Sequence, residues 1–218
     1  MANSKPHVIL SAAISIDGKI STRSGDSKLS SSEDFIRLHK LRSKVDGIIV
    51  GKNTVIKDNP LLTVRHTKGK NPVRIILDSK GNISSKSKIL QTSKQIPTII
   101  AVSKTISKSN LQKLNKFPVE VIITGEKSVN IKSLLKKLSA KDMNTLLVEG
   151  GGTINWEFIK QNLFDEMIIT LSPYLIGGNN TISLVQGIGF DKISKSPHLR
   201  LKSIKRLKNH LVLNYLKV

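Results

Sequence analysis

The chain of 218 residues has no cysteine and is poor in aromatic and acidic residues. Without cysteine it forms no disulfide and no thiolate metal site, and it has no cysteine nucleophile. Aromatic residues make up only 4% of the sequence, which leaves few side chains on which nucleic acid bases could stack. We find no apolar run long enough to span a bilayer, and no secretory leader. These absences predict a cytoplasmic protein without a membrane segment.

Basic residues outnumber acidic residues by 36 to 15, which gives a formal net charge of +21. Such a charge attracts anions, including nucleic acid, acidic lipid and phosphorylated metabolites. The lysines are spread from Lys5 to Lys217, however, and form no dense tract. Most of this charge is therefore interpreted as a solvated, lysine-rich surface. Specific nucleic-acid binding stays open as a disfavoured alternative.

Recognised signatures of metal binding and of covalent catalysis are missing. None of the five histidines pairs with another at the spacing of metal ligands, and no carboxylate cluster completes a site, so no metal is expected. The chain has no Gly-x-Ser-x-Gly elbow and no Walker lysine loop. What remains is a set of clusters of Gly, Ser, Thr, Lys and Asp at the ends of predicted strands. Such clusters suit an extended phosphorylated ligand better than a covalent intermediate.

The most informative of these clusters follows a short apolar run at residues 146–148. Glu149 comes next, then the glycines 150–152, and then Thr153 at the start of a predicted helix. Glycines allow a sharp turn and a close approach of another molecule, and a helix N-terminus favours a phosphate. The acid lies at the strand end where open α/β sheets bind ligands. A tight strand–helix turn without a ligand explains the same residues equally well, so both interpretations stay open.

Two further strand ends have a related character. An apolar strand at residues 48–50 leads into a predicted helix start at 51–54, which ends before Pro60 because the residue before a proline avoids helical geometry. The strand predicted at residues 73–77 ends in Asp-Ser-Lys-Gly, where a hydroxyl and a lysine could hold a phosphate. Between them lies Arg65, a candidate bidentate anchor for a phosphate. A plain turn and a surface arginine are the simpler alternatives.

The order of elements predicts an α/β fold. Strands are expected at residues 7–15, 48–50, 73–77, 98–102, 119–123, 146–148 and 166–171, and a terminal antiparallel hairpin at 199–207 and 210–216. Helices are expected after Ser30, Gly51, Ile106, Asn130 and Gly152. We therefore predict one mixed, mostly parallel sheet with helices on both faces and a C-terminal antiparallel hairpin. No charge break or linker marks a boundary, so residues 1–218 are expected to form a single domain.

Two local predictions concern the first helix and a later connector. The first helix should bury Phe35, Leu38 and Leu41, with a charged face that includes Arg42 in solvent. The Ser/Lys-rich residues 84–94 should form an exposed connector.

The order of several motifs resembles a known family. These motifs are Ser11-Ala12-Ala13-Ile14-Ser15-Ile16-Asp17-Gly18-Lys19-Ile20, Gly25-Asp26-Ser27, Leu41-Arg42, Gly51-Lys52-Asn53-Thr54-Val55, Asp58-Asn59-Pro60-Leu61-Leu62-Thr63-Val64-Arg65, Leu77-Asp78-Ser79 and Val148-Glu149-Gly150-Gly151-Gly152-Thr153. Together they resemble the pyrimidine reductases of riboflavin biosynthesis, whose fold is that of dihydrofolate reductase. The resemblance runs from Ile9 to the last strand. One position departs from the bacterial pattern, because Leu29 stands where those relatives carry a tryptophan near the nicotinamide.

The resemblance implies an NADPH-dependent reductase that converts a ribosylamino-pyrimidine 5′-phosphate to its ribityl product by hydride transfer to C1′. The positions that match cofactor contacts, together with Lys80 as a possible contact to the 2′-phosphate, are Ala13, Thr54, Asp58, Ser79, Lys80, Gly150, Gly151, Gly152, Thr153 and Ile154. Those that match substrate contacts are Ser27, Arg42, Leu62, Arg65 and Glu149. Asp58 or Glu149 could transfer a proton during ring opening, and the sequence does not choose between them. Family members tend to be homodimers, so a homodimer is expected.

Several alternatives accompany this interpretation. A reductase without a fused zinc deaminase resembles the archaeal and fungal type, which acts on 2,5-diamino-6-ribosylamino-4(3H)-pyrimidinone 5′-phosphate. Reduction could instead follow deamination, with 5-amino-6-(5-phosphoribosylamino)uracil as substrate. A dihydrofolate reductase is a further alternative, although Arg42 and Arg65 would then have no sugar phosphate to bind. A non-enzymatic, basic nucleic-acid-binding protein would explain the charge and leave the glycine clusters unexplained.

Overall fold

The computed structural model describes residues 5–218, which divide into two compact units. Unit 1 comprises Lys40–Leu147 together with the start of the chain up to Pro6. Unit 2 comprises His7–His39 and Val148–Val218. The single domain expected over residues 1–218 stays a prediction.

Unit 1 is built on buried parallel strands. Its sheet has the order β7-β3-β4-β5-β6, and the pairs β3–β4, β4–β5 and β5–β6 are parallel. The bounds are β3 (Gly47–Gly51), β4 (Val73–Leu77), β5 (Thr98–Val102), β6 (Glu120–Ile123) and β7 (Thr145–Val148). In β3, Ile48, Ile49 and Val50 are all completely buried. A continuous apolar run of this kind is typical of a strand that is covered on both faces.

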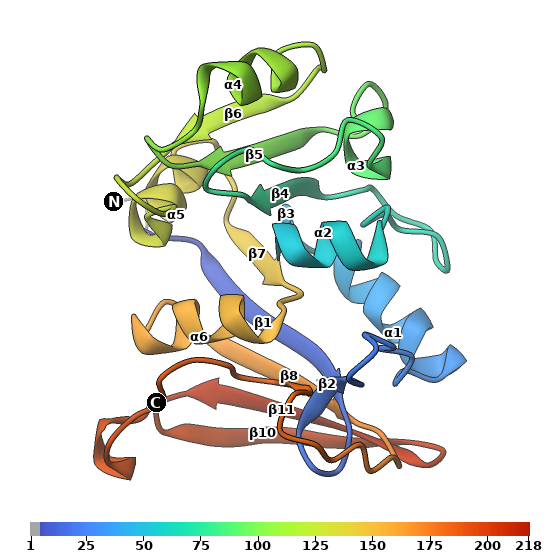
Figure 1. Cartoon of the computed structure of the whole chain (residues 1–218). Helices are drawn as coiled ribbons and strands as arrows, with labels where there is room; N and C mark the ends of the chain where they lie inside the picture. Colours follow the sequence, from blue (N-terminus) through green and yellow to red (C-terminus); the bar gives the residue numbers. More distant parts are fainter. Residues whose placement is uncertain (1–4) are drawn as a thin grey trace. The chain divides into compact units, whose positions relative to one another are not determined.

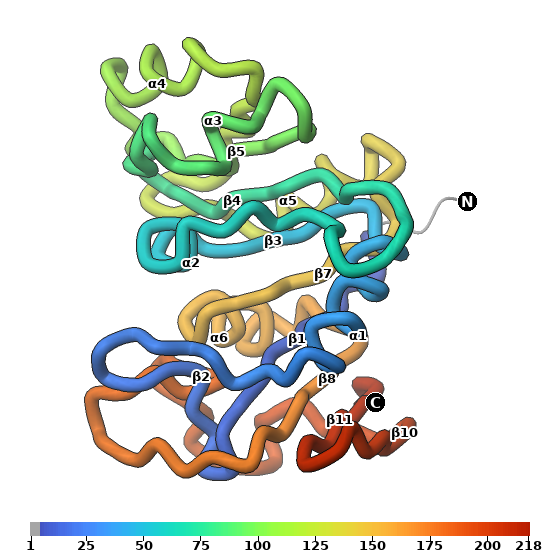
Figure 2. Tube along the Cα trace, turned by 90° about the vertical axis from the view of Figure 1, so that its right-hand side faces the viewer, coloured from blue at the N-terminus to red at the C-terminus, as the bar shows by residue number. Residues whose placement is uncertain are grey.

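The helices of unit 1 are short and are mostly capped by side chains. They are α2 (Lys52–Asp58), α3 (Lys88–Gln91), α4 (Lys108–Leu114) and α5 (Ile131–Ser139). Ser87, Ser107 and Asn130 each accept a hydrogen bond from the backbone N–H three residues further on, which satisfies part of the first turn. The helices α2 and α5 lie on opposite faces of the strands (Figures 1 and 2). The helix α5 buries four apolar residues at helical spacing, so its hydrophobic face packs inward.

Unit 2 combines parallel and antiparallel strands. Its main sheet has the order β10-β11-β8-β1, in which β1 and β8 are parallel and β8, β11 and β10 are antiparallel. The bounds are β1 (His7–Ile14), β8 (Glu166–Leu171), β10 (Leu199–Leu207) and β11 (His210–Lys217). The remaining elements are β2 (Lys19–Ser21) paired with β9 (Ile182–Ser183), the helices α1 (Ser32–Arg42) and α6 (Gly152–Lys160), and a 3-10 turn η1 (Ile193–Lys195). The helix α1 starts in unit 2 and ends in unit 1.

The predicted fold class is confirmed: the fold is mixed α/β with mostly parallel pairing and a C-terminal antiparallel hairpin. The strands β4, β5 and β8 have the bounds that the sequence predicted. The prediction missed the two-residue and three-residue strands β9 and β2, which are stable only through their pairing with each other.

The predicted buried face of α1 is wrong. Phe35 is 44% exposed, whereas Asp34, His39 and Arg42 are buried. Asp34 is buried because its carboxylate accepts hydrogen bonds from the Thr170 hydroxyl at 2.7 Å and from Arg37 Nε at 2.7 Å. The hydrogen bonds of polar side chains therefore decide the orientation of this helix, and the apolar spacing was a misleading guide.

The prediction of an exposed connector over residues 84–94 is also wrong. These residues contain α3, whose Ile89 and Leu90 are almost completely buried. The high content of serine and lysine hid this apolar pair. The Ser87 side chain caps the helix, so a residue that suggested a loop in fact starts a helix.

Arg74 of β4 is completely buried, and its guanidinium lies between α3 and the start of β5. Arg74 donates to the Thr98 hydroxyl from Nε and Nη2 at 3.0 and 2.6 Å, and to the Thr92 hydroxyl at 2.7 Å. It also donates to the carbonyls of Ile89 and Ile96 at 2.8 and 3.2 Å. Burial lowers the pKa of Arg74 to about 10, so the group is still charged at neutral pH. Neutral oxygens alone thus solvate a buried cation.

Arg74→Met should destabilise the protein, because it leaves several buried oxygens without a donor. We expect the free energy of unfolding to fall by at least about 3 kcal/mol. Denaturant unfolding followed by circular dichroism measures this change. The matched control is Arg200→Met on the exposed strand β10, which should change stability by no more than about 0.5 kcal/mol. Equal losses in the two variants would contradict the importance of the buried network.

Candidate functional site

The residues predicted for the site divide between the two units. Those in unit 1 are Arg42, Thr54, Asp58, Leu62, Arg65, Ser79 and Lys80. Those in unit 2 are Ala13, Ser27, Glu149, Gly150, Gly151, Gly152, Thr153 and Ile154.

In unit 1, Thr63 brings two of the predicted substrate residues together. Arg42 is 8% exposed and donates from Nη1 to the Thr63 carbonyl at 3.2 Å. Arg65 donates from Nη1 to the Thr63 hydroxyl at 2.7 Å. Two guanidinium groups therefore contact one residue, which places two cations close together. Such a pair suits a doubly charged phosphate, to which guanidinium groups bind with two parallel hydrogen bonds.

The segment that carries Thr63 is held in an unusual backbone conformation. Asn59 and Leu62 have φ values of 40° and 52°, a region that residues other than glycine rarely adopt. Leu62 is nevertheless 2% exposed, so its side chain is fixed in the core of unit 1. The Leu61 carbonyl accepts from Arg74 Nη1 at 3.3 Å. Backbone strain that the surroundings maintain is typical of functional segments.

Thr54 and Asp58 lie four residues apart on α2, so they share one face of the helix. Asp58 is the last residue of the helix and remains in contact with solvent. Partial desolvation still raises the pKa of its carboxyl group, and the charge of Lys57 opposes this shift. A carboxyl group with a raised pKa holds its proton to a higher pH, which suits proton transfer.

Ser79 and Lys80 follow β4 at the carboxyl edge of the sheet. The Ser79 hydroxyl accepts from the Val129 N–H at 3.2 Å, and its carbonyl accepts from the Ser103 hydroxyl at 3.0 Å. The carbonyl of Lys80 accepts from the side chain of Asn110 at 2.8 Å, and the residue itself is exposed. The ends of neighbouring strands thus meet at this edge, where α/β sheets bind ligands.

In unit 2, the glycine turn leads directly into α6. The N-cap residue Gly151 has no side chain to cap the helix, and Thr153 is an exposed residue of the first turn. The backbone N–H groups of this turn and the helix dipole therefore favour an anion. These residues fit the pyrophosphate of the dinucleotide that the resemblance implies.

Packing within the chain accounts for two of the three glycines. A Cβ atom on Gly152 would lie 2.4 Å from the Ser183 carbonyl oxygen, which no side chain tolerates. The Gly152 carbonyl accepts from the Gln186 N–H at 3.1 Å. Gly150 has φ +80°, and a Cβ there would lie 3.1 Å from Asn155 Oδ1. The close approach that the sequence indicated is thus made partly by β9 and the segment that follows it.

The other predicted residues of unit 2 lie at the ends of strands and in a loop. Ala13 is half-buried near the end of β1 and pairs with Thr170 of β8. Glu149 follows β7 directly and is half-buried. Ser27 is exposed, and its carbonyl accepts from the Leu29 N–H at 2.8 Å. Ser27 belongs to the segment 22–29, which we call the cavity loop.

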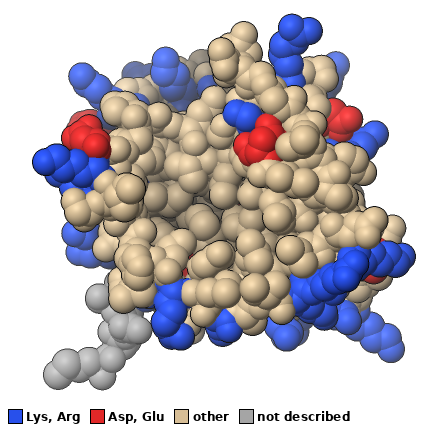
Figure 3. Space-filling model, turned by 90° about the horizontal axis from the view of Figure 1, so that it is seen from below, with Lys and Arg blue, Asp and Glu red and all other residues tan. Residues whose placement is uncertain are grey.

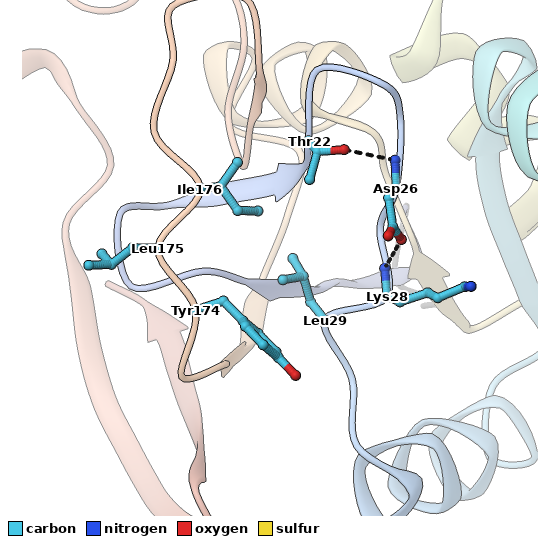
Figure 4. Close-up of a pocket in the computed structure, with 7 residues that line it drawn as sticks. All are labelled: Thr22, Asp26, Lys28, Leu29, Tyr174, Leu175 and Ile176. Carbon is cyan, nitrogen blue, oxygen red and sulfur yellow. Dashed lines mark hydrogen bonds between the residues drawn. The ribbon is translucent and has the colours of Figure 1, made fainter.

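The cavity loop forms one side of a cavity of about 370 Å³. The cavity is lined by Thr22, Asp26, Lys28, Leu29, Tyr174, Leu175 and Ile176. Figure 4 shows Leu29 at the centre of this group, while the side chains of Lys28 and Leu175 extend away from it. The lining thus combines an aliphatic centre with an aromatic ring and a charged rim. A ring with polar substituents suits such a lining.

The opposite side of the cavity is held by Asp17. Its carboxylate accepts from the Ser15 hydroxyl at 2.6 Å, from the Ile176 N–H at 3.0 Å and from the Gly177 N–H at 2.6 Å. These hydrogen bonds lower the pKa of Asp17 to about 2, the bond from Ser15 contributing most. A charged Asp17 therefore fixes residues 174–177.

Charge is dispersed on the surface. On the face shown in Figure 3, Lys and Arg side chains lie around the margin, and other residue types cover the middle. Among residues 5–218 no group of three His, Asp or Glu side chains could hold a metal ion. No helix in this part of the chain has the length and apolar character needed to cross a membrane.

Comparison with known families identifies the chain. The family described as RibD C-terminal domain matches residues 6–213. The chain belongs to this family. The family membership that the motif order predicted is therefore confirmed.

Two relatives align with this chain over nearly their full length. A protein of Aquifex aeolicus is 43% identical over 204 residues, which cover 91% of each chain. A protein of Methanothermobacter thermautotrophicus is 36% identical over 214 residues, which cover 97% of this chain and 98% of the relative. Both carry the name 2,5-diamino-6-ribosylamino-4(3H)-pyrimidinone 5′-phosphate reductase.

Solved structures agree with the fold. The RibD of Acinetobacter baumannii superimposes with a TM-score of 0.86 at 25% identity, covering 100% of this chain and 59% of that chain. The chain thus spans somewhat more than half of that longer protein. A dihydrofolate reductase of Enterococcus faecalis, solved with NADP(H), gives a TM-score of 0.54 at 11% identity, with 97% and 96% coverage. The predicted dihydrofolate reductase-like fold is therefore confirmed.

Several residues around the site of this RibD C-terminal domain were missed by sequence reasoning. Arg74 could have been noticed, because an arginine within an otherwise apolar strand requires a special environment. Asp17 was named only as part of a motif, with no role of its own. Thr63 was quoted within a motif without a role, and its contact with Arg42 depends on a separate helix. Tyr174 gave no signal, because it lines the cavity together with residues of a loop far away in the sequence.

The pH dependence of stability should reveal the contribution of Asp17. The pKa of Asp17 is about 2 in the folded protein, whereas its ordinary value is 3.8. The charged carboxylate therefore stabilises the fold fully when the pH is above 3.8. This stabilisation is lost as the pH falls toward the pKa of the folded protein. We expect Asp17→Asn to lower Tm by a constant amount above about pH 5. The difference should shrink below about pH 4 and vanish near about pH 2. Asp191→Asn, at an exposed carboxylate of the same unit, controls for the change in net charge. A Tm difference that does not change with pH would contradict the role of the charged carboxylate.

Proposed function

We propose that the chain is an NADPH-dependent reductase of riboflavin biosynthesis. Its substrate is 2,5-diamino-6-ribosylamino-4(3H)-pyrimidinone 5′-phosphate, and it reduces the ribosylamino group to a ribitylamino group. The observation that carries this proposal is the relative of that name, which is 43% identical over 91% of both chains. Cytoplasmic location and a homodimeric state belong to the same proposal.

Arg42 and Arg65 support binding of the sugar phosphate. Both guanidinium groups contact Thr63, so their spacing is set by one residue and its backbone. Each hydrogen bond from a guanidinium group to an anion contributes more than a neutral hydrogen bond, typically about 1.5–3 kcal/mol. Dihydrofolate has no sugar phosphate, which leaves this pair without a ligand in the alternative of a dihydrofolate reductase.

The turn at Gly150 and Gly151 and the first turn of α6 support binding of a dinucleotide. Their backbone N–H groups would hold the pyrophosphate, while Thr54 and Ser79 of unit 1 are proposed to contact the cofactor as well. Lys80 is exposed and its ammonium would neutralise a 2′-phosphate. NADPH supplies a hydride when it is bound, and the protein supplies orientation.

The reaction begins with opening of the substrate's ribose ring. The ring oxygen leaves C1′ and takes a proton, while the exocyclic nitrogen loses its proton and forms an imine with C1′. The imine carbon then accepts a hydride and its nitrogen accepts a proton, so one hydride and one proton are consumed overall. Partial desolvation raises the pKa of Asp58, and this carboxyl group is proposed to transfer the proton during ring opening. Glu149 would accept hydrogen bonds from the amino groups of the pyrimidine.

The proposal is tested by NADPH oxidation with the purified protein. The diamino pyrimidinone substrate and its deaminated counterpart, 5-amino-6-(5-phosphoribosylamino)uracil, are offered separately. Faster turnover of the diamino compound means that reduction precedes deamination, and faster turnover of the uracil reverses that order. If neither is turned over, a thermal-shift experiment with NADPH follows, because ligand at about a hundredfold its Kd stabilises a protein by roughly 2.7 kcal/mol. Absence of both turnover and stabilisation would exclude the reductase and favour a nucleic-acid-binding protein.

Arg65→Ala should raise KM for the substrate and change kcat less, because the arginine contacts a group that does not react. We expect kcat/KM to fall about 10- to 100-fold, which corresponds to one charge-assisted hydrogen bond. Lys68→Ala, which removes an exposed cation from the same segment of the chain, is the matched control and should leave kcat/KM within about twofold. With a substrate that lacks the phosphate, wild type and Arg65→Ala should become equal. A persisting difference would remove Arg65 from phosphate binding.

A further inference from the structure

We infer that Ser172 and His210 are positioning residues of the reductase, which fix the backbone at Leu29 and thereby hold the cavity loop in its working position. The inference rests on the proposed function, because it takes this loop, with Ser27, as part of the substrate site. Neither Ser172 nor His210 belongs to the set of residues that the motifs predicted.

Both side chains donate to the same carbonyl oxygen. The Ser172 hydroxyl lies 2.6 Å from the Leu29 oxygen, and His210 Nε2 lies 3.0 Å from it. The exposed fraction is 0% for Ser172, 7% for His210 and 5% for Leu29, so no water competes for this oxygen. A carbonyl only accepts hydrogen bonds, so Nε2 of the imidazole carries the hydrogen. Nδ1 is buried and has no hydrogen-bond partner in the described part of the chain.

The cavity loop is otherwise closed mainly on itself. The Thr22 N–H donates to the Asp26 carbonyl at 2.8 Å, and the Asp26 N–H donates to the Thr22 hydroxyl at 3.1 Å. Gly25, with φ +92°, completes this tight turn. The Asp26 carboxylate accepts from the Lys28 N–H at 3.0 Å. A segment bonded in this way moves as one body, so its position depends on the anchor at its end.

The anchor at Leu29 lies where the loop passes into α1. Ser172 follows β8, and His210 is the first residue of β11, directly after the turn of the terminal hairpin. Lys208 of that turn also pairs with Glu33 in the first turn of α1. The hairpin therefore holds both the last residue of the loop and the start of the helix.

The loop and the opposite cavity wall are held by separate anchors. Ser172 and His210 act on the Leu29 carbonyl, whereas Asp17 acts on the backbone of Ile176 and Gly177. Leu29 occupies the centre of the cavity lining in Figure 4. A small shift of the Leu29 backbone therefore changes the shape of the cavity, and misplacement by about 1 Å is enough to slow a reaction.

Two donors on one acceptor make a specific prediction of non-additivity. While either donor remains, the buried carbonyl is still satisfied. When both donors are removed, the buried Leu29 oxygen is left without a partner. A loop position that exposes this oxygen to water then becomes lower in free energy. We expect Ser172→Ala and His210→Leu each to lower kcat about threefold or less, and the double variant to lower it at least about 30-fold.

The conservative variants Ser172→Thr and His210→Gln keep a donor and should restore most of kcat. His198→Leu, at an exposed histidine close to β10, is the matched control and should behave as wild type. The KM for the substrate should change less than kcat in each single variant. A loss of folded protein would also lower the apparent kcat at unchanged KM, so kcat is calculated per mole of folded protein. Tm values show that each variant is folded at the assay temperature.

Hydrogen exchange of the ligand-free protein gives a readout that does not depend on activity. The amides of residues 22–30 should exchange at least about tenfold faster in the double variant, whereas those of β1 and β8 should keep their rates. If the double variant does not fold, the two single variants decide the same question, because each loses one of the two hydrogen bonds to the Leu29 oxygen. Exchange of residues 22–30 that is faster than in wild type supports the anchor, and unchanged exchange overturns it.

Additive kinetic effects, or unchanged exchange in residues 22–30, would overturn the positioning role. If the wild-type protein turns over neither pyrimidine substrate, the proposed function fails, and the exchange experiment still tests the anchor. Faster exchange of the loop together with an unchanged kcat would show that the anchor exists and does not serve the reaction, which also overturns the inference.

Discussion

The burial of one cation, Arg74, constrains much of unit 1. A guanidinium group removed from water must find oxygen atoms in several directions at once, and a strand cannot supply them alone. Here they come from the end of α3, from the start of β5 and from the Leu61 carbonyl. Through the Leu61 carbonyl, Arg74 also links α3 and β5 to the segment that carries Thr63 and Arg65. The local strain at Leu62 is tolerated because these hydrogen bonds and the burial of its side chain outweigh it.

Unit 2 uses the same principle with neutral and acidic groups. The Leu29 carbonyl, the Asp17 carboxylate and the Asp34 carboxylate each collect two or more donors from segments that lie far apart in the sequence or across a turn. In each case the polar group lies beside a loop or a helix start rather than inside a regular ladder. Hydrophobic burial stabilises the sheet through an attraction that has no preferred direction. Directional hydrogen bonds then decide where the loops of the candidate site lie.

This division explains what could be predicted from the sequence. The buried strands β4, β5 and β8 were predicted with their correct bounds, because a continuous apolar run needs no knowledge of its neighbours. The helix α1 was predicted with the wrong buried face, because Asp34 and Arg42 are buried through partners that the sequence does not reveal. The short elements α3, β2 and β9 were missed, because they are stable only in their tertiary surroundings.

For the candidate site, the limit lies in motifs that have two physical explanations. Gly152 belongs to a turn whose composition indicates a ligand, yet the Ser183 carbonyl occupies the space that its missing side chain leaves. From the sequence, close packing by the chain itself and close approach by a phosphate look the same, since both require the absence of Cβ. The structure distinguishes packing by the chain from space for a phosphate at each residue separately. Gly152 serves the packing of the segment after β9, and the first turn of α6, which begins at Gly152 and has no side-chain cap, keeps the backbone donors that an anion needs. The same stretch of sequence thus stabilises the turn by close packing and leaves the helix N-terminus without a side-chain cap, as an anion site requires.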